Sequence, residues 1–138
     1  MFKTEIGALV LRVTLGIIFF FHGLAKFQGG IENIAGWFDS IGLPGPMAYA
    51  VAGVELIGGI ALILGLGTKA VSGLFALLML GATLKVKLSA GLLGNGEAAG
   101  YELDLALFAI AIFLVINGSK LLSIDSLIFG KKEEQITM

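Results

Sequence analysis

The sequence predicts an all-α membrane protein, in which four transmembrane helices form a bundle and a short amphipathic helix lies at the membrane surface between the first two. The composition supports this class, because 57% of the 138 residues are hydrophobic, whereas soluble domains have roughly 45–50%. Charged residues make up 14%, against roughly 25% in soluble domains. A soluble chain of this length has too little interior to bury so much apolar surface. We therefore infer that lipid surrounds most of the chain.

Four apolar stretches approach the length of roughly 20 residues that a helix needs to cross a bilayer. A single apolar span satisfies its own backbone hydrogen bonds only as a helix, so each stretch is expected to be helical. Residues 65–68, with the sequence Gly-Leu-Gly-Thr, predict a tight turn between the second and third spans. The spans are expected over about 6–27, 46–66, 69–88 and 102–117.

These spans form one predicted domain, residues 1–130, followed by a charged tail over residues 131–138. The connection between the first two spans carries apolar residues at helical spacing, which predicts an amphipathic helix on the membrane surface. Trp37 is expected at the level of the lipid headgroups. A lid over a pocket in the bundle is the alternative role for this segment. Its apolar face comprises Ile31, Ile34, Ala35, Phe38 and Ile41.

The lysines predict the orientation, because basic residues accumulate on the cytoplasmic side of membrane proteins. In a four-span arrangement, one side carries Lys3, Lys69, Lys120, Lys131 and Lys132. The other side carries Lys26, Lys85 and Lys87 together with the acids Glu32, Asp39, Glu97, Glu102 and Asp104. Both termini are therefore expected in the cytoplasm.

Ionisable residues inside the spans are the first candidates for function, since a charge at the bilayer centre costs at least ~2.5–3.5 kcal/mol. Glu55 is expected roughly 13 Å deep in the second span, where it must be protonated, pair with a cation or face water. Arg12, His22 and Lys26 fall within an arc of roughly 80° on the first span, so all three can point into the bundle. The structural alternatives are an ion pair that locks two helices, and an Arg12 side chain that reaches the membrane surface.

Charged residues from all four spans are expected to surround a cavity that opens to the outer leaflet. The candidate catalytic residues are Glu55 and His22. The candidate substrate-binding residues are Arg12, Lys26, Lys85, Glu102 and Asp104. Apolar walls are expected from Phe19, Phe20, Phe21, Met79 and Phe108.

Such a pocket suits proton transfer to and from an oxygen atom, and quinones and catechols are apolar rings with two oxygens. No metal site is predicted, because the chain has one histidine and no cysteine. The net charge of −1 argues against nucleic acid, since no basic face is available to neutralise phosphates.

Three motifs in this chain resemble those of the DoxX family. Arg12-x3-Gly16-x5-His22-Gly23-x2-Lys26 looks like the family's first helix. Glu55-x2-Gly58-Gly59-x2-Leu62-x2-Gly65-x2-Thr68 is similar to its second helix and turn. Gly118 followed by Ser123-Ile124-Asp125 is similar to its closing segment.

The resemblance implies a four-helix membrane protein of the prokaryotic cell membrane. The resemblance also implies that the protein is an oxidoreductase, or the quinone-binding subunit of one, and that it acts on quinone or catechol-type compounds or in sulfur oxidation. Members of the family are also associated with oxidative-stress complexes. Quinone is the expected cofactor, and a soluble or membrane redox partner protein is expected to carry electrons. One alternative is a non-enzymatic accessory subunit that binds a lipid, a small hydrophobic ligand or a partner complex. A third alternative function is a small exporter of phenolic or quinone compounds. Assembly of the chain into a homo-oligomer is also an open alternative.

Overall fold

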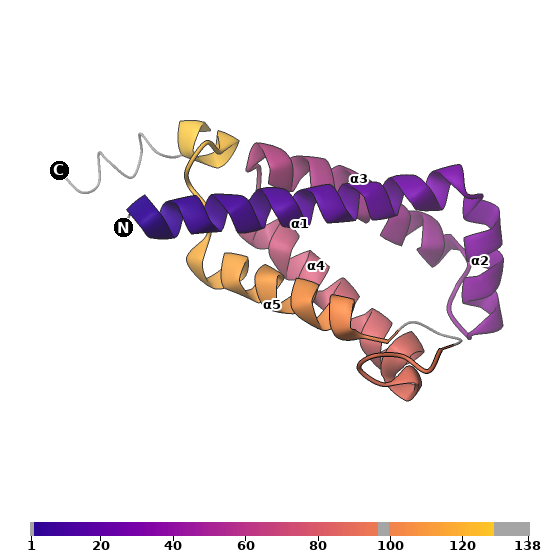
Figure 1. Cartoon of the computed structure of the whole chain (residues 1–138). Helices are drawn as coiled ribbons and strands as arrows, with labels where there is room; N and C mark the ends of the chain where they lie inside the picture. The colour runs from indigo at the N-terminus through magenta and orange to yellow at the C-terminus, as the bar shows by residue number, and fades with distance from the viewer. Residues whose placement is uncertain (1, 97–99, 129–138) are drawn as a thin grey trace.

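The computed structural model describes residues 2–96 and 100–128, and the regular elements in these ranges are helices (Figure 1). A helical turn over residues 124–128 follows the last long helix. The tail expected over residues 131–138 lies outside the described residues. The elements are α1 (Phe2–Gln28), α2 (Ile31–Ser40), α3 (Pro46–Leu64), α4 (Thr68–Ala82), the π-helix η1 (Thr83–Lys87), the 3₁₀ turn η2 (Leu88–Ala90) and α5 (Glu102–Asn117).

Three of the four expected spans are helices that are long and apolar enough to cross a membrane. They cover Lys3–Gln28, Pro46–Leu64 and Thr68–Val86 within the described residues. The fourth expected span is also a helix, α5, but it has only 16 residues. At 1.5 Å per residue it is about 24 Å long, which is shorter than a hydrocarbon core of roughly 30 Å. The four-span bundle therefore stays a prediction.

Helices α1 and α3 run antiparallel, and their backbones touch at glycines. A Cβ atom on Gly59 would lie 2.6 Å from the backbone nitrogen of Phe20. A Cβ atom on Gly16 would lie 2.8 Å from the carbonyl oxygen of Gly59, and one on Gly23 would lie 2.9 Å from that of Ala52. These distances leave no room for a side chain, so glycine is what allows the two helices to approach so closely.

The most extensive helix–helix contacts are those between α1 and α3 and those between α4 and α5. The apolar core joins these two pairs of helices. At its centre the rings of Phe19 and Phe75 stack with a centroid distance of 3.8 Å. Aromatic stacking of this kind adds to the free energy gained from burial alone. The buried members of the core are Leu15, Phe19, Leu62, Phe75, Ala76, Leu107, Ala111 and Leu114.

The amphipathic segment is helix α2, which runs across the direction of α1 and α3 at one end of the molecule (Figure 1). Its predicted apolar face is buried or half-buried, with Phe38 the most enclosed residue, whereas Glu32 and Asn33 are exposed. Trp37 is 45% exposed. The Gly45 backbone N–H donates to Asp39 Oδ1 at 2.9 Å, which ties α2 to the start of α3. This geometry is the one expected of a surface helix.

The start of α1 and the segment after α5 lie at the same end of the molecule, opposite α2 (Figure 1). The Lys120 backbone N–H donates to Glu5 Oε2 at 3.2 Å, which joins the two segments directly. This segment, residues 118–128, is called the closing segment below, and its polar groups contact the first turns of α1.

Replacing Gly59 by alanine should destabilise the protein, because the new Cβ would collide with the backbone of α1. We expect a loss of about 1–3 kcal/mol, as for other over-packed interiors, measured by thermal or denaturant unfolding in detergent. Gly53→Ala on the same helix is the control, because a Cβ there meets nothing within 4 Å. It should be neutral or slightly stabilising. Equal effects of the two variants would show that the contact does not depend on glycine.

Candidate functional site

An ion pair between α1 and α3 is the strongest candidate for a functional site. Lys26 Nζ lies 2.8 Å from Glu55 Oε1 and 2.7 Å from Glu55 Oε2. The Glu55 side chain is 5% exposed and that of Lys26 is 24% exposed. The carboxylate is thus enclosed, while the lysine side chain is partly exposed.

The close approach of the two helices positions this pair. Gly23 packs directly on the backbone of α3 at Ala52 and Leu56. Lys26 lies three residues after Gly23, and Glu55 lies between the two contacted residues of α3, so both charges are within one turn of the contact. A larger residue in place of Gly23 would push the helices apart and lengthen the ion pair.

The pair can also do chemistry, because both partners exchange protons and one donor remains available. An ammonium group carries three N–H donors, and the two oxygens of Glu55 engage two of them. The third can donate to an oxygen atom of a bound molecule. A carboxylate held beside that oxygen can accept or return a proton. Removing either partner would leave an uncompensated buried charge, which typically costs about 3–5 kcal/mol in a protein interior.

Arg12 belongs to a different polar centre and does not contact Glu55. Its side chain is 1% exposed, because the segment after α5 covers it, and its position relative to the membrane surface stays a prediction. Nη1 donates to Leu121 O at 3.0 Å and to Ser119 Oγ at 3.2 Å, and Nη2 donates to Leu122 O at 3.0 Å. Arg12 precedes Lys26 by 14 residues, which is about 21 Å along a helix. Arg12 and Lys26 lie on the same side of α1, which was compatible with a shared site. They are too far apart along the helix axis to share one, and Arg12 contacts the segment after α5 instead.

The other candidate residues do not join the Lys26–Glu55 pair. His22, Lys85 and Glu102 are exposed, and Asp104 is buried in the first turn of α5. Lys85 Nζ lies 3.9 Å from the position that a Cβ on Gly42 would take, which places it beside the connection between α2 and α3. The ring of charges around one cavity stays a prediction. Their roles in catalysis or binding stay predictions.

The expected aromatic walls are also divided. Phe19 is buried in the core against Phe75, whereas Phe21 is 60% exposed. These neighbouring phenylalanines were expected to line one cavity, but consecutive residues on a helix point in different directions. Packing against α4 then selects Phe19 for the core.

Asp125 is a polar residue with a specific contact that the sequence analysis did not select as a candidate. Its Oδ1 accepts from the Gly67 backbone N–H at 2.9 Å, and its Oδ2 accepts from the Thr68 backbone N–H at 3.2 Å. The carboxylate thereby caps the first turn of α4, where a negative charge is favourable. The sequence carried a signal for this contact, because the second motif ends at Thr68 and the third ends at Asp125.

Comparison with known proteins finds relatives that are similar over most of the chain. The chain is 48% identical over 134 residues to the Bacillus subtilis protein named "Putative oxidoreductase CatD", covering 96% of each. It is 30% identical over 129 residues to an uncharacterized membrane protein of Mycobacterium tuberculosis, covering 86% of this chain and 79% of that protein. It is 29% identical over 126 residues to an uncharacterized protein of Haemophilus influenzae, covering 88% of this chain and 90% of that protein.

No solved structure matches the chain. The sequence model of the DoxX family matches residues 7–88, a range that contains the glycine contact between α1 and α3 and both partners of the ion pair. The match covers more than half of the chain, and the Bacillus subtilis relative extends the similarity over nearly its whole length. The protein belongs to the DoxX family.

Proposed function

We propose that this protein is the quinone-binding component of a membrane oxidoreductase, and that a quinone or catechol-type ring binds beside Lys26 and Glu55. The observation that carries the proposal is the ion pair, in which the Glu55 carboxylate is enclosed while the Lys26 side chain is 24% exposed. Two apolar helices surround it, so an apolar ring can approach from the lipid. The name of the Bacillus subtilis relative, which describes an oxidoreductase, supports the reaction class.

Reduction of a quinone to a quinol takes up two protons and two electrons, and oxidation of the quinol releases them. Lys26 donates a hydrogen bond to a ring oxygen and thereby orients the ring. Glu55 accepts a proton from that oxygen or returns it. The chain has no cysteine to hold a dithiol or an iron–sulfur cluster. We therefore propose that a redox partner protein delivers or removes the electrons.

We further propose that α5 is a fourth membrane span, so that both termini lie in the cytoplasm of a prokaryotic cell. Helix α5 packs along α4, which is itself part of a candidate span. A Cβ on Gly118, just after α5, would lie 3.0 Å from Lys69 Cε at the start of α4, so the two helices are antiparallel. Because α5 runs antiparallel along α4, it crosses the bilayer if α4 does. The bilayer can accommodate a helix as short as α5 by local thinning.

A non-enzymatic accessory subunit is the second candidate function. The observation that favours it is that Lys26 contacts both oxygens of Glu55, as a purely structural lock between two helices would. The two functions differ in what a double substitution does to ligand binding.

Glu55→Gln should weaken binding of a short-chain ubiquinone analogue by at least about tenfold, which corresponds to about 1.4 kcal/mol. The amide keeps the shape of the side chain and can still accept a hydrogen bond from Lys26, but it cannot take up a proton. Stability should fall because Lys26 loses its counter-charge, so unfolding is measured alongside binding to show that the variant is folded during the titration. Binding is measured by titration of the purified protein in nanodiscs. The matched control is Glu32→Gln on the exposed surface of α2, which should bind as the wild type does.

The double variant Lys26→Met with Glu55→Met separates the two candidate functions. Replacing a buried ion pair by apolar residues of similar volume is often neutral or stabilising, so the unfolding temperature should stay near that of the wild type. Quinone binding should be lost if the pair is the site. Retained binding by this stable double variant would contradict the proposed site and favour the accessory role.

The transmembrane topology can be tested by cysteine labelling, because the chain has no cysteine of its own. Asn33→Cys and Asn95→Cys should react with a membrane-impermeant maleimide in intact cells. Leu127→Cys, at a position 79% exposed, should react only after lysis. If Asn95→Cys and Leu127→Cys react from the same side, α5 does not cross the membrane.

A further inference from the structure

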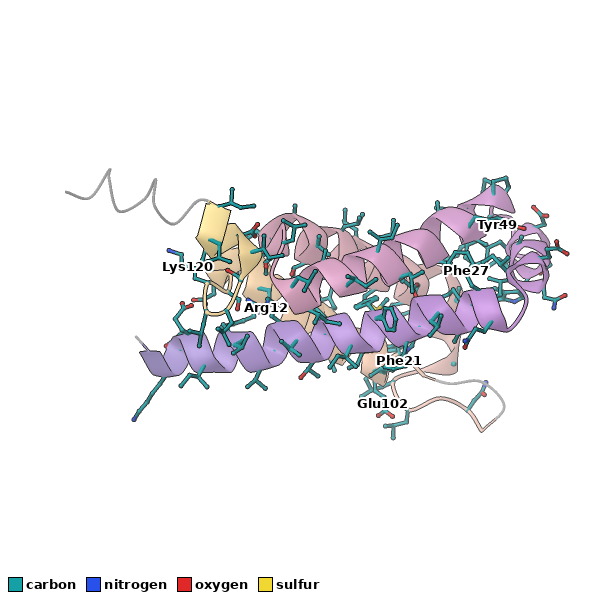
Figure 2. All side chains as sticks on the ribbon, turned by 90° about the horizontal axis from the view of Figure 1, so that it is seen from above. Arg12, Phe21, Phe27, Tyr49, Glu102 and Lys120 are labelled. Carbon is teal, nitrogen blue, oxygen red and sulfur yellow. The ribbon has the colours of Figure 1, made fainter. Side chains whose placement is uncertain are left out.

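A cleft of about 390 Å³ lies at the end of the molecule opposite α2. It is formed where α4 begins and where the chain leaves α5, and Figure 2 shows Lys120 and Arg12 at this end. The volume falls within the range of small-molecule sites. The lining residues are Gly67, Thr68, Lys69, Ala70, Gly118, Ser119, Lys120, Ser123, Asp125 and Ser126.

The residues that line the cleft are positive on balance, although the whole chain carries −1 and Glu5, outside the lining, accepts from the Lys120 backbone N–H. Two lysines line it, Lys69 and Lys120, against one carboxylate, Asp125. That carboxylate is engaged by two backbone N–H groups of the α4 start, and it also attracts the nearby Arg12 guanidinium. The stem of Lys69 lies over Gly118, where a Cβ would meet Lys69 Cε at 3.0 Å, and both residues line the cleft.

Two buried hydroxyl groups line the same cleft with hydrogen-bonding capacity left over. Thr68 is 3% exposed, and its Oγ1 has no hydrogen-bond partner within the described residues. Ser119 is 5% exposed, and its Oγ accepts from Arg12 Nη1 at 3.2 Å, so its own hydrogen remains to be donated. A buried polar group without a partner costs about 1–3 kcal/mol, which a bound acceptor would recover.

We propose that this cleft binds a phosphate-bearing ligand. Lys69 and Lys120 neutralise its charge, and the hydroxyls of Thr68 and Ser119 donate to its oxygens. The cleft sits at the ends of α4 and α5, where phospholipid headgroups lie if these helices cross the membrane, and basic pockets between helices at that depth bind anionic headgroups. A free phosphate compound from the cytoplasm offers the same chemistry. The site is about 20 Å from the Lys26–Glu55 pair along α1 and does not depend on the function proposed for that pair.

The test titrates the delipidated full chain in detergent with phosphatidylglycerol and, separately, with glycerol 3-phosphate. Lys69→Gln and Lys120→Gln should each weaken binding of the phosphatidylglycerol probe about fivefold, as expected for one basic residue near an anionic headgroup. Thr68→Val keeps the side-chain shape and should also weaken binding. The matched control is Lys3→Gln, an exposed lysine at the same end of the molecule that does not line the cleft.

Binding of phosphatidylglycerol that glycerol 3-phosphate does not displace supports the site and assigns it to lipid. Displacement by glycerol 3-phosphate, with the same sensitivity to Lys69→Gln, supports the site and assigns it to a soluble phosphate compound. Absence of binding by both probes overturns the proposal. An equal loss in Lys3→Gln also overturns it, because the attraction would then come from the surface charge as a whole. Unfolding temperatures of the variants, unchanged from the wild type, exclude misfolding as the cause.

Discussion

The backbone contact between α1 and α3 is the constraint on which the rest of the structure depends. Between helices in lipid there is little hydrophobic driving force, so association rests on close packing and polar contacts. Gly16 and Gly23 on α1, with Gly59 on α3, remove the side chains that would hold the helices apart. The short distance that results lets Lys26 reach Glu55 with both N–O contacts under 3 Å. These three glycines therefore position Lys26 and Glu55 beside each other.

The buried Arg12 and the partly exposed Lys26, both on α1, are stabilised in different ways, and the difference separates a structural role from candidate chemistry. Arg12 is surrounded by neutral acceptors, mainly the carbonyl oxygens of Leu121 and Leu122. A guanidinium group stays protonated in proteins, so Arg12 holds the closing segment in place and exchanges no proton. Lys26 instead faces a carboxylate. In that pair a proton can pass between the partners or to a bound molecule, which is what a redox reaction of a quinone requires.

The closing segment after α5 organises the opposite end of the molecule. It supplies the acceptors for Arg12, and through Asp125 it also caps the first turn of α4. A Cβ on Gly65 would lie 2.7 Å from the Ser123 Cα, so the turn between α3 and α4 packs directly on this segment. One short stretch thus joins α1, the α3–α4 turn and α5. The phosphate cleft proposed here is built from the same residues, so the segment shapes a surface as well as closing the fold.

Hydrophobicity and periodicity were sufficient to predict the helical class, the bounds of the helices within a few residues, and the apolar face of α2. They also singled out Glu55, because a carboxylate in the middle of an apolar helix is conspicuous whatever surrounds it. The position of a residue around one helix follows from 100° per residue. Its partner depends on which helix lies opposite and at what depth, and this is a property of the packed chain. Only the tertiary structure therefore decided that Glu55 pairs with Lys26, that Arg12 turns to the closing segment and that His22 remains exposed. The tertiary structure also decided that Asp125 caps α4, because the segment that contains Asp125 has no periodicity that would indicate which helix it contacts.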